Sequence, residues 1–154
     1  MNEVPVTIDP LRKRVVVPLP PEDAFVLFTE GMASWWPLVT HSVAGERAIS
    51  CRFEPLAGGR IYEIDDEGRE VEWGRILLFE PPGRLIFSWY PGRGAETAQE
   101  VEVVFERVEG GTAVALEHRG WESLREDALE VRGNYEAGWD LVLGRFLESA
   151  ATQR

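Results

Sequence analysis

Apolar and polar residues alternate along the middle of the chain, and this alternation predicts β-strands. In residues 100–106, Val101, Val103 and Phe105 fall on one side and three glutamates fall on the other. A repeat of two residues places like side chains on one face of a strand and does not fit a helix. One face of the resulting sheet is therefore expected to meet water, as in an antiparallel sheet that is covered on one side only.

Four such strands follow one another and predict an antiparallel meander. The first and last connections are tight turns, Pro81-Pro82-Gly83 and Glu109-Gly110-Gly111, built from residues that favour turns. A polar stretch that contains glycine, Pro91–Ala98, joins the middle pair. The four predicted strands are Glu70–Glu80, Arg84–Tyr90, Gln99–Val108 and Thr112–Gly120.

Three shorter strands are predicted before the meander. In the second of them, Ile49, Cys51 and Phe53 are expected on one face, which indicates a half-buried strand. The three predicted ranges are Arg12–Leu19, Arg47–Glu54 and Arg60–Ile64.

Helical segments frame these strands. A helix is predicted to begin at Pro20-Pro21-Glu22-Asp23, because proline suits the first turn and acidic side chains favour the positive helix end. A second, short helix is predicted over Met32–Trp36. Near the C-terminus, residues 135–150 carry one apolar stripe at helical spacing. The segment Glu122–Arg132 also fits a helix, which Gly133-Asn134 is expected to interrupt.

The order of these elements predicts an α+β fold in one domain, residues 1–154, with a curved antiparallel sheet of six to seven strands around a long C-terminal helix. A single helix does not cover such a sheet without leaving volume between the two layers. Large aromatic side chains at inward positions either fill that volume or line it, and the sequence leaves both alternatives open.

The composition of the chain argues against several classes of function. The net charge of −11 opposes binding to nucleic-acid phosphates and to anionic lipid. The single cysteine, Cys51, excludes an internal disulfide and fits a small buried residue better than a reactive thiol. No apolar stretch approaches the roughly 20 residues that span a bilayer, and residues 1–5 do not begin a secretory signal. A cytoplasmic protein is expected.

Short motifs in a fixed order cover nearly the whole chain. They are Pro20-Pro21-Glu22-Asp23-Ala24-Phe25 with Trp35-Trp36-Pro37, Gly58-Gly59-Arg60-Ile61-Tyr62-Glu63, Glu72-Trp73-Gly74-Arg75-Ile76-Leu77, Glu80-Pro81-Pro82-Gly83-Arg84-Leu85 with Phe87-Ser88-Trp89, Gly110-Gly111-Thr112 leading to Leu116-Glu117-His118-Arg119-Gly120-Trp121, and Gly138-Trp139. With these motifs the chain resembles the START-like (SRPBCC) superfamily, whose helix-grip fold is also that of the major birch pollen allergen. Within it, the chain is most similar to homologues of the C-terminal domain of the heat-shock-protein ATPase activator.

The resemblance implies a cavity between the sheet and the long helix that binds apolar small molecules, and it implies no cofactor. It does not imply one activity, because the superfamily includes carriers, cyclases and chaperone partners.

His118 and Glu63 are the best candidates for catalytic residues. Both are expected to point to the interior, where the imidazole could shuttle a proton and the carboxylate could complete an acid–base pair. The alternatives are a buried, hydrogen-bonded His118 and a Glu63 that reaches solvent or pairs with an arginine. Arg75, expected on the same face as Trp73, either recognises a ligand carboxylate or pairs with a glutamate.

Aromatic side chains supply most of the predicted ligand site. Trp35 and Trp36 are expected to gate the cavity or to pack in the core, and Tyr135 is expected to offer a hydroxyl. His41 lacks the companion ligands that a metal site needs, so no metal is expected. The full predicted ligand-binding set is Trp35, Trp36, Phe53, Glu63, Trp73, Arg75, Phe87, Trp89, Phe105, His118, Tyr135 and Trp139.

Three functions remain open from the sequence. The first is a module that binds a hydrophobic or amphipathic small molecule, and the second is a cofactor-independent cyclase, dehydratase or hydrolase that uses the same cavity. The third is a co-chaperone-like interaction domain, which is disfavoured because the chain lacks the additional N-terminal domain of the full activator. Neither nucleic-acid binding nor membrane insertion is expected, and available edge strands are compatible with a monomer or a homodimer.

Overall fold

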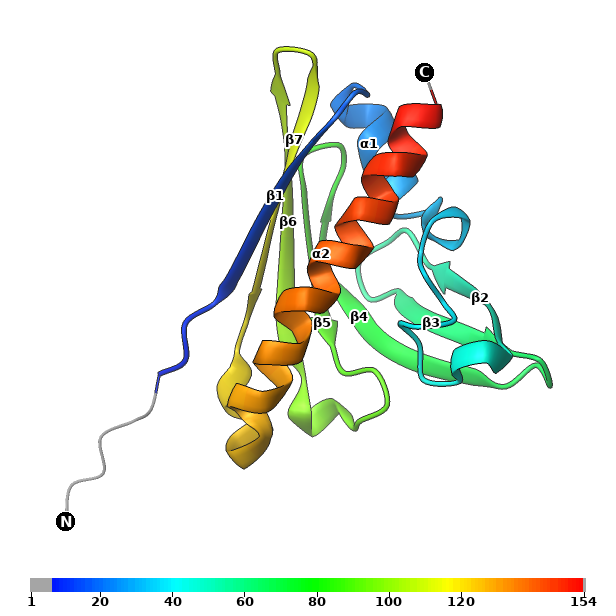
Figure 1. The fold of residues 1–154 in the computed structure, drawn as a ribbon, viewed down its shortest axis with the longest axis vertical. Helices are drawn as coiled ribbons and strands as arrows, with labels where there is room; N and C mark the ends of the chain where they lie inside the picture. The colour runs from blue at the N-terminus through cyan, green and yellow to red at the C-terminus, as the bar shows by residue number, and fades with distance from the viewer. Residues whose placement is uncertain (1–6, 154) are drawn as a thin grey trace.

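Seven antiparallel strands form one curved sheet in the computed structural model, which describes residues 7–153 (Figure 1). The strands lie in the order β1-β7-β6-β5-β4-β3-β2, so the first strand of the chain pairs with the last. The predicted α+β helix-grip class is confirmed. The strands are β1 (Leu11–Val17), β2 (Ala48–Phe53), β3 (Arg60–Asp65), β4 (Glu70–Glu80), β5 (Arg84–Trp89), β6 (Gln99–Val108) and β7 (Gly111–Arg119).

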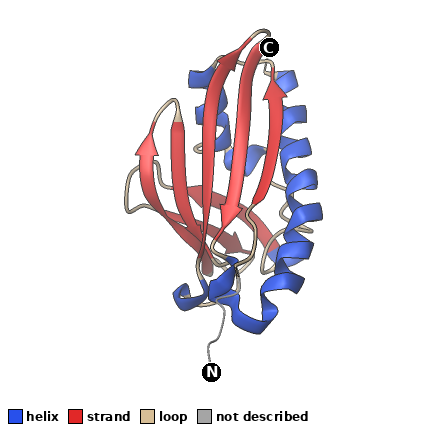
Figure 2. Ribbon diagram, turned by 90° about the vertical axis from the view of Figure 1, so that its left-hand side faces the viewer, coloured by secondary structure: helices blue, strands red, loops and turns tan. Residues whose placement is uncertain are grey.

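Two α-helices pack against this sheet. Helix α1 (Pro21–Phe28) follows β1, and α2 (Ala128–Thr152) runs along the length of the sheet (Figures 1 and 2). The predicted interruption at Gly133-Asn134 is wrong, because α2 passes through both residues. A glycine lowers helix propensity by about 1 kcal/mol, and tertiary packing of a helix offsets such a cost. The break lies earlier, at Arg125, whose φ is 55°.

Short 3₁₀ segments replace two of the predicted α-helical stretches. Met32–Ser34 is a single 3₁₀ turn where a short helix over Met32–Trp36 was expected. A second 3₁₀ segment, Trp121–Asp127, leads into α2. Both are short connectors, which is the usual role of 3₁₀ geometry.

Aromatic rings fill one end of the space between sheet and helix. The ring of Phe28 lies 5.8 Å from that of Phe105 and 5.3 Å from that of Phe146, centroid to centroid. Phe25 lies 5.0 Å from Phe105, and Trp35 lies 5.0 Å from Phe146. All five side chains are buried. At this end the aromatic residues therefore fill the interior.

Two β-bulges in β4 change which side chains face inward. Gly74 pairs with Ile61 of β3, but the next β3 residue, Tyr62, pairs with Glu72, so Trp73 is an extra residue on β4. A bulge shifts the alternation of the strand that carries it. The expectation that Arg75 shares the face of Trp73 is therefore wrong: Trp73 is buried and Arg75 is exposed.

The same effect operates at Leu77 and at Ile49. Leu77 is the extra residue between Ile76 and Leu78 in the pairing of β4 with β5, and it is 51% exposed. Ile49 is the extra residue in the pairing of β2 with β3, and it is 65% exposed. The predicted common face of Ile49, Cys51 and Phe53 is therefore wrong at its first member, while Cys51 and Phe53 are buried.

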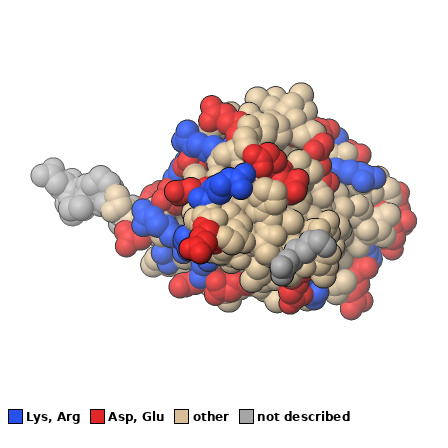
Figure 3. All heavy atoms as spheres, turned by 90° about the horizontal axis from the view of Figure 1, so that it is seen from above, with Lys and Arg blue, Asp and Glu red and all other residues tan. Residues whose placement is uncertain are grey.

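Acidic and basic side chains are interspersed on the face seen in Figure 3, rather than separated by sign. Within residues 7–153, no helix is long and apolar enough to cross a membrane. Burial raises the pKa of the Cys51 thiol to about 12, so this cysteine is a protonated core residue. The N-terminal residues 1–5, expected not to form a secretory signal, lie outside the described residues.

Candidate functional site

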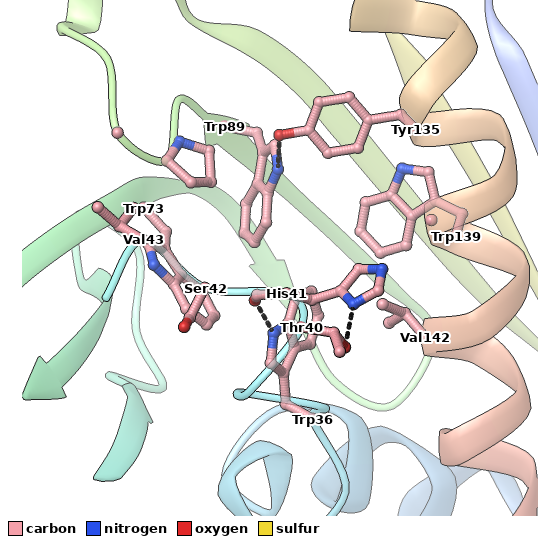
Figure 4. A pocket seen from close by; sticks show the side chains of 13 residues that line it. Trp36, Thr40, His41, Ser42, Val43, Trp73, Trp89, Tyr135, Trp139 and Val142 are labelled. Atoms are coloured by element: carbon pink, nitrogen blue, oxygen red, sulfur yellow. Dashed lines mark hydrogen bonds between the residues drawn. The ribbon is translucent and has the colours of Figure 1, made fainter. Parts of the chain in front are cut away.

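A pocket of about 390 Å³ lies between the sheet, α2 and the loop of residues 37–45, here called the pocket loop (Figure 4). The pocket loop contributes residues 40–43. Strands β4 and β5 contribute Trp73 and Trp89, and α2 contributes Tyr135 and Trp139. The other end of the interior is filled by phenylalanines, whereas this end keeps a pocket that is lined by tryptophans.

Four indole rings form a compact cage around the pocket. Trp36 lies 5.1 Å from Trp73, 5.8 Å from Trp89 and 6.1 Å from Trp139, centroid to centroid. Trp89 lies 5.6 Å from Trp73 and 6.0 Å from Trp139. These separations are typical of aromatic pairs that pack in edge-to-face or tilted arrangements. The four side chains are buried, so each ring is held by its neighbours.

Every indole N–H of the protein donates a hydrogen bond to a group of the protein itself. A molecule in the pocket would therefore meet the apolar faces and edges of the indoles, and none of their donors. The six bonds run from Trp35 to the Leu27 carbonyl, from Trp36 to the His41 carbonyl, from Trp73 to the Glu63 carboxylate, from Trp89 to the Tyr135 hydroxyl, from Trp121 to the His118 carbonyl and from Trp139 to the His118 ring.

Glu63 anchors the pocket loop to the sheet. This carboxylate on β3 is fully buried, and it accepts hydrogen bonds from the backbone N–H groups of Val43 at 2.7 Å and Ala44 at 2.8 Å. It also accepts the indole N–H of Trp73 at 2.6 Å. Glu63 points inward, as one of the sequence alternatives had it, but its partners are the main chain of the loop and an indole. Its carboxylate does not line the pocket.

His41 lies at the pocket loop's contact with α2. Its carbonyl accepts the Trp36 indole N–H at 2.7 Å, and its Nδ1 lies 2.7 Å from the Thr40 hydroxyl (Figure 4). A Cβ at Gly138 would lie 3.6 Å from His41 Nε2, so the ring lies close to α2 where the helix carries no side chain, and both residues line the pocket. Burial lowers the pKa of His41, so the ring is neutral at pH 7.

Tyr135 brings a hydroxyl to the opposite side of the pocket (Figure 4). Its oxygen accepts the Trp89 indole N–H at 3.0 Å. An indole only donates, so the hydroxyl hydrogen of Tyr135 is not used in this bond. Burial raises the pKa of Tyr135, and the hydroxyl stays protonated at neutral pH.

His118 lies behind the pocket wall and does not line the pocket. It is fully buried, with its ring stacked 4.0 Å from that of Trp121. Nδ1 accepts from Trp139 at 2.9 Å, and Nε2 lies 3.1 Å from the side-chain oxygen of Gln99. Burial lowers the pKa of His118 to about 3, so the ring is neutral. The arrangement matches the alternative of a buried, hydrogen-bonded histidine.

The remaining predicted site residues divide between the pocket, the core and the outer surface. Arg75 pairs with Glu72 at 2.9 Å on the exposed side of β4, away from the pocket. Those that line the pocket are Trp36, Trp73, Trp89, Tyr135 and Trp139; those buried elsewhere are Trp35, Phe53, Phe87 and Phe105.

The pocket loop is the part of the site that sequence reasoning missed. His41 was considered in the sequence only as a metal ligand, and its neighbours Thr40 and Ser42 were given no role. A loop position shows no periodicity, and this segment is held over the pocket by the contacts of Glu63 and by the bond between the Trp36 indole and the His41 carbonyl. The signal in the sequence was the run of three polar side chains, residues 40–42, that closely follows Trp36-Pro37. Among residues 7–153, no group of three His, Cys, Asp or Glu side chains could hold a metal ion.

Comparison with solved structures finds the same fold in proteins of different descriptions. Txn09, an anthrahydroquino-gamma-pyrone synthase, is 32% identical to this chain, with a TM-score of 0.61, over 94% of this chain and 99% of Txn09. A protein from Rhodobacter sphaeroides is 27% identical, with a TM-score of 0.65, over 91% of this chain and 89% of that chain. The Aha1 dimer from Colwellia psychrerythraea has a TM-score of 0.69 at 14% identity, over 93% and 96% of the two chains, and shows the fold alone.

No curated protein matches the chain. The family model described as Activator of Hsp90 ATPase homolog 1-like protein matches residues 18–151. This match runs from the segment before α1 into the last turn of α2, and so covers every element that lines the pocket. The chain therefore belongs to the family of Activator of Hsp90 ATPase homolog 1-like proteins, as the order of its motifs predicted.

Proposed function

We propose that the protein binds a flat, largely apolar small molecule in the pocket, in contact with the indoles that line it. The observation that carries this proposal is the cage of Trp36, Trp73, Trp89 and Trp139, whose N–H groups are all bonded within the protein. Such a lining offers π-faces and apolar area, and aromatic ligands pack on it with the offset or edge-to-face geometry that aromatic pairs prefer. The volume of about 390 Å³ falls in the usual range of small-molecule sites.

A flat ring system fits this lining better than a flexible acyl chain. An acyl chain gains nothing specific from π-faces and loses rotational freedom when it is bound. A rigid ring system loses little freedom, and it can meet some indoles with its face and others with its edge. The name of the relative Txn09, an anthrahydroquino-gamma-pyrone synthase, denotes chemistry on fused rings, which supports the same class of ligand here.

Tryptophan fluorescence tests the proposal directly, because four of the six indoles surround the site. The protein is titrated with anthrone, a flat tricyclic ketone, and separately with palmitate, while N-acetyltryptophanamide corrects for absorption by the ligand. We expect a saturable change of emission with anthrone in the micromolar range and a much weaker response with palmitate. A panel of flat tricyclic ligands that produces no saturable change overturns the proposal.

A further inference from the structure

We infer that the pocket is also a site of proton transfer, in which His41 acts as general base and Tyr135 donates a hydrogen bond to the oxyanion that forms. The inference rests on the proposed function, since the same pocket holds the substrate. The substrate class is a flat molecule with a carbonyl group and an acidic C–H bond conjugated with that carbonyl.

The first observation is that few polar atoms of the pocket lining are free to form a hydrogen bond with a ligand. The indole N–H groups are used within the protein. The hydroxyl of Ser42 donates to the Leu38 carbonyl at 2.6 Å and accepts the backbone N–H of Gly45 at 2.9 Å. Among the described side chains that line the pocket, His41 Nε2 and the hydroxyl hydrogen of Tyr135 are the groups left free to act on a ligand.

The second observation is the hydrogen bond that orients His41. The Thr40 hydroxyl lies 2.7 Å from His41 Nδ1 and 3.4 Å from the Pro37 carbonyl. The proposed arrangement assigns the hydroxyl hydrogen to this carbonyl, so that the hydroxyl oxygen accepts the proton of Nδ1. The lone pair of the ring is then on Nε2, which lies beside Gly138 in the pocket lining. A neighbouring group that fixes the tautomer in this way is what a catalytic imidazole requires.

The third observation is that Tyr135 is aligned as a donor. The Trp89 indole N–H holds the phenol oxygen at 3.0 Å and leaves its hydrogen to point at a ligand. Figure 4 shows the Tyr135 hydroxyl above the Trp89 indole, and the His41 ring between the Trp139 and Trp36 indoles. A flat ligand placed between them presents one edge to a base and another to a donor.

The proton-transfer step needs no cofactor. His41 Nε2 takes the proton of the acidic C–H bond, and the electron pair of that bond moves into the conjugated system and ends on the carbonyl oxygen. The resulting enolate oxygen accepts the hydrogen bond of Tyr135. The imidazolium exchanges its proton with solvent and returns one proton to the same carbon atom, which restores the carbonyl compound and neutral His41. Nothing is oxidised or reduced.

The protonation states of the two groups at neutral pH agree with these roles. Burial lowers the pKa of His41, which keeps the ring available as a base. Burial raises the pKa of Tyr135, which keeps the phenol available as a donor.

Anthrone serves as the probe, because its methylene protons exchange with solvent through the enol form. Exchange is followed by proton NMR in deuterium oxide under nitrogen, while binding is followed by tryptophan fluorescence on the same samples. We expect the protein to accelerate exchange and His41→Gln to lower the rate by about 100-fold with an unchanged Kd. Tyr135→Phe should also lower the rate, and Glu136→Gln, an exposed change on the same helix, should not.

Thr40→Val tests whether Thr40 positions the His41 ring, because the tautomer of the ring would not change if Thr40 only supported the fold. It should lower the exchange rate and shift the tautomer of the His41 ring, which heteronuclear NMR of the imidazole nitrogens reports. Binding of anthrone without acceleration, or equal acceleration by the protein and by His41→Gln, overturns the inference and leaves the proposed function standing. Failure of all flat ligands to bind overturns both.

Discussion

Trp139 of α2 donates its indole N–H to Nδ1 of His118 on β7 over 2.9 Å. Because an indole is only a donor, this bond places the imidazole proton on Nε2, which donates to the side-chain oxygen of Gln99 at 3.1 Å. Both nitrogens of the neutral ring have a hydrogen-bond partner. Protonation of Nδ1 would place its N–H against the N–H of Trp139. His118 therefore joins the long helix to the last strand, and its neutrality is a condition of the folded state.

Acid is expected to destabilise the protein through His118. Burial lowers the pKa of this residue from 6.5 to about 3 in the folded protein. Between these values the unfolded chain binds more protons, so the free energy of unfolding falls as pH decreases through this window, by up to about 1.4 kcal/mol per pH unit. The contribution is fully present above pH 6.5. Urea unfolding at a series of pH values measures the slope.

The matched variant for this experiment is His118→Gln, which keeps an amide of similar reach but does not titrate. The slope of its unfolding free energy against pH should be lower than that of the unaltered protein by the amount that His118 contributes. Equal slopes would show that the histidine does not drive the acid response, and that carboxylates alone account for it.

Replacement of Glu63 by glutamine should loosen the pocket loop. The carboxylate accepts three N–H donors, and an amide offers one oxygen and a competing NH₂ group. A buried donor that loses its partner costs about 1–3 kcal/mol. We expect a loss of that size in urea unfolding, with faster hydrogen exchange at the amides of Val43 and Ala44. Glu70→Gln, an exposed partner of Arg60, is the control and should change neither quantity.

Gly74→Ala should strongly destabilise the sheet. A Cβ at this position would overlap the Ser88 carbonyl on the neighbouring strand, so the β4 backbone would have to move away from β5. Overpacking of this kind costs about 1–3 kcal/mol, and broken ladder hydrogen bonds add to it. Gly83→Ala, where a Cβ meets nothing within 4 Å, should have a thermal midpoint close to that of the unaltered protein. A Gly74→Ala protein of normal midpoint would contradict the bulge geometry.

Gly138→Leu should close the pocket without unfolding the protein. A Cβ there makes ordinary contact with His41 at 3.6 Å, and because Gly138 lines the pocket, the larger side chain is expected to occupy part of the pocket volume. Removing a helical glycine favours the helix by up to about 1 kcal/mol, so stability should be kept while ligand affinity falls by at least about tenfold, or 1.4 kcal/mol. Differential scanning fluorimetry and the fluorescence titration measure the two effects.

Gly144→Leu is the control for this change, because it replaces a glycine of the same helix away from the pocket. It should leave affinity unaltered. Equal losses of affinity in the two variants would place the ligand elsewhere.

The antiparallel meander and the buried face of β6 could be predicted because no bulge interrupts the pairing of β6 with its neighbours. Val101, Val103 and Phe105 are buried as expected. The errors at Arg75 and Ile49 have one cause. A bulge adds a single residue to a strand, and the sequence around Trp73 and around Ile49 does not show which residue is the extra one.

The candidate site was predictable only where it is made of aromatic residues on regular elements. Trp73 and Trp89 on strands and Trp139 on α2 could be placed from periodicity, and all three line the pocket. His118 was predicted as a site residue because it is a histidine on an inward face of the sheet. Its ring does point inward, but it lies behind Trp139 and not in the pocket. His41 was passed over because its position depends on a contact between a loop and Glu63, residues distant in sequence.

Glu63 grips the main chain of the pocket loop and leaves its side chains uninvolved. Substitutions among those side chains therefore do not weaken the anchor. The residue that holds the loop in place and the loop side chains that face the pocket lie in separate stretches of the sequence. A few substitutions in the loop can therefore change the preference for a ligand, in evolution or by engineering, while the fold is kept.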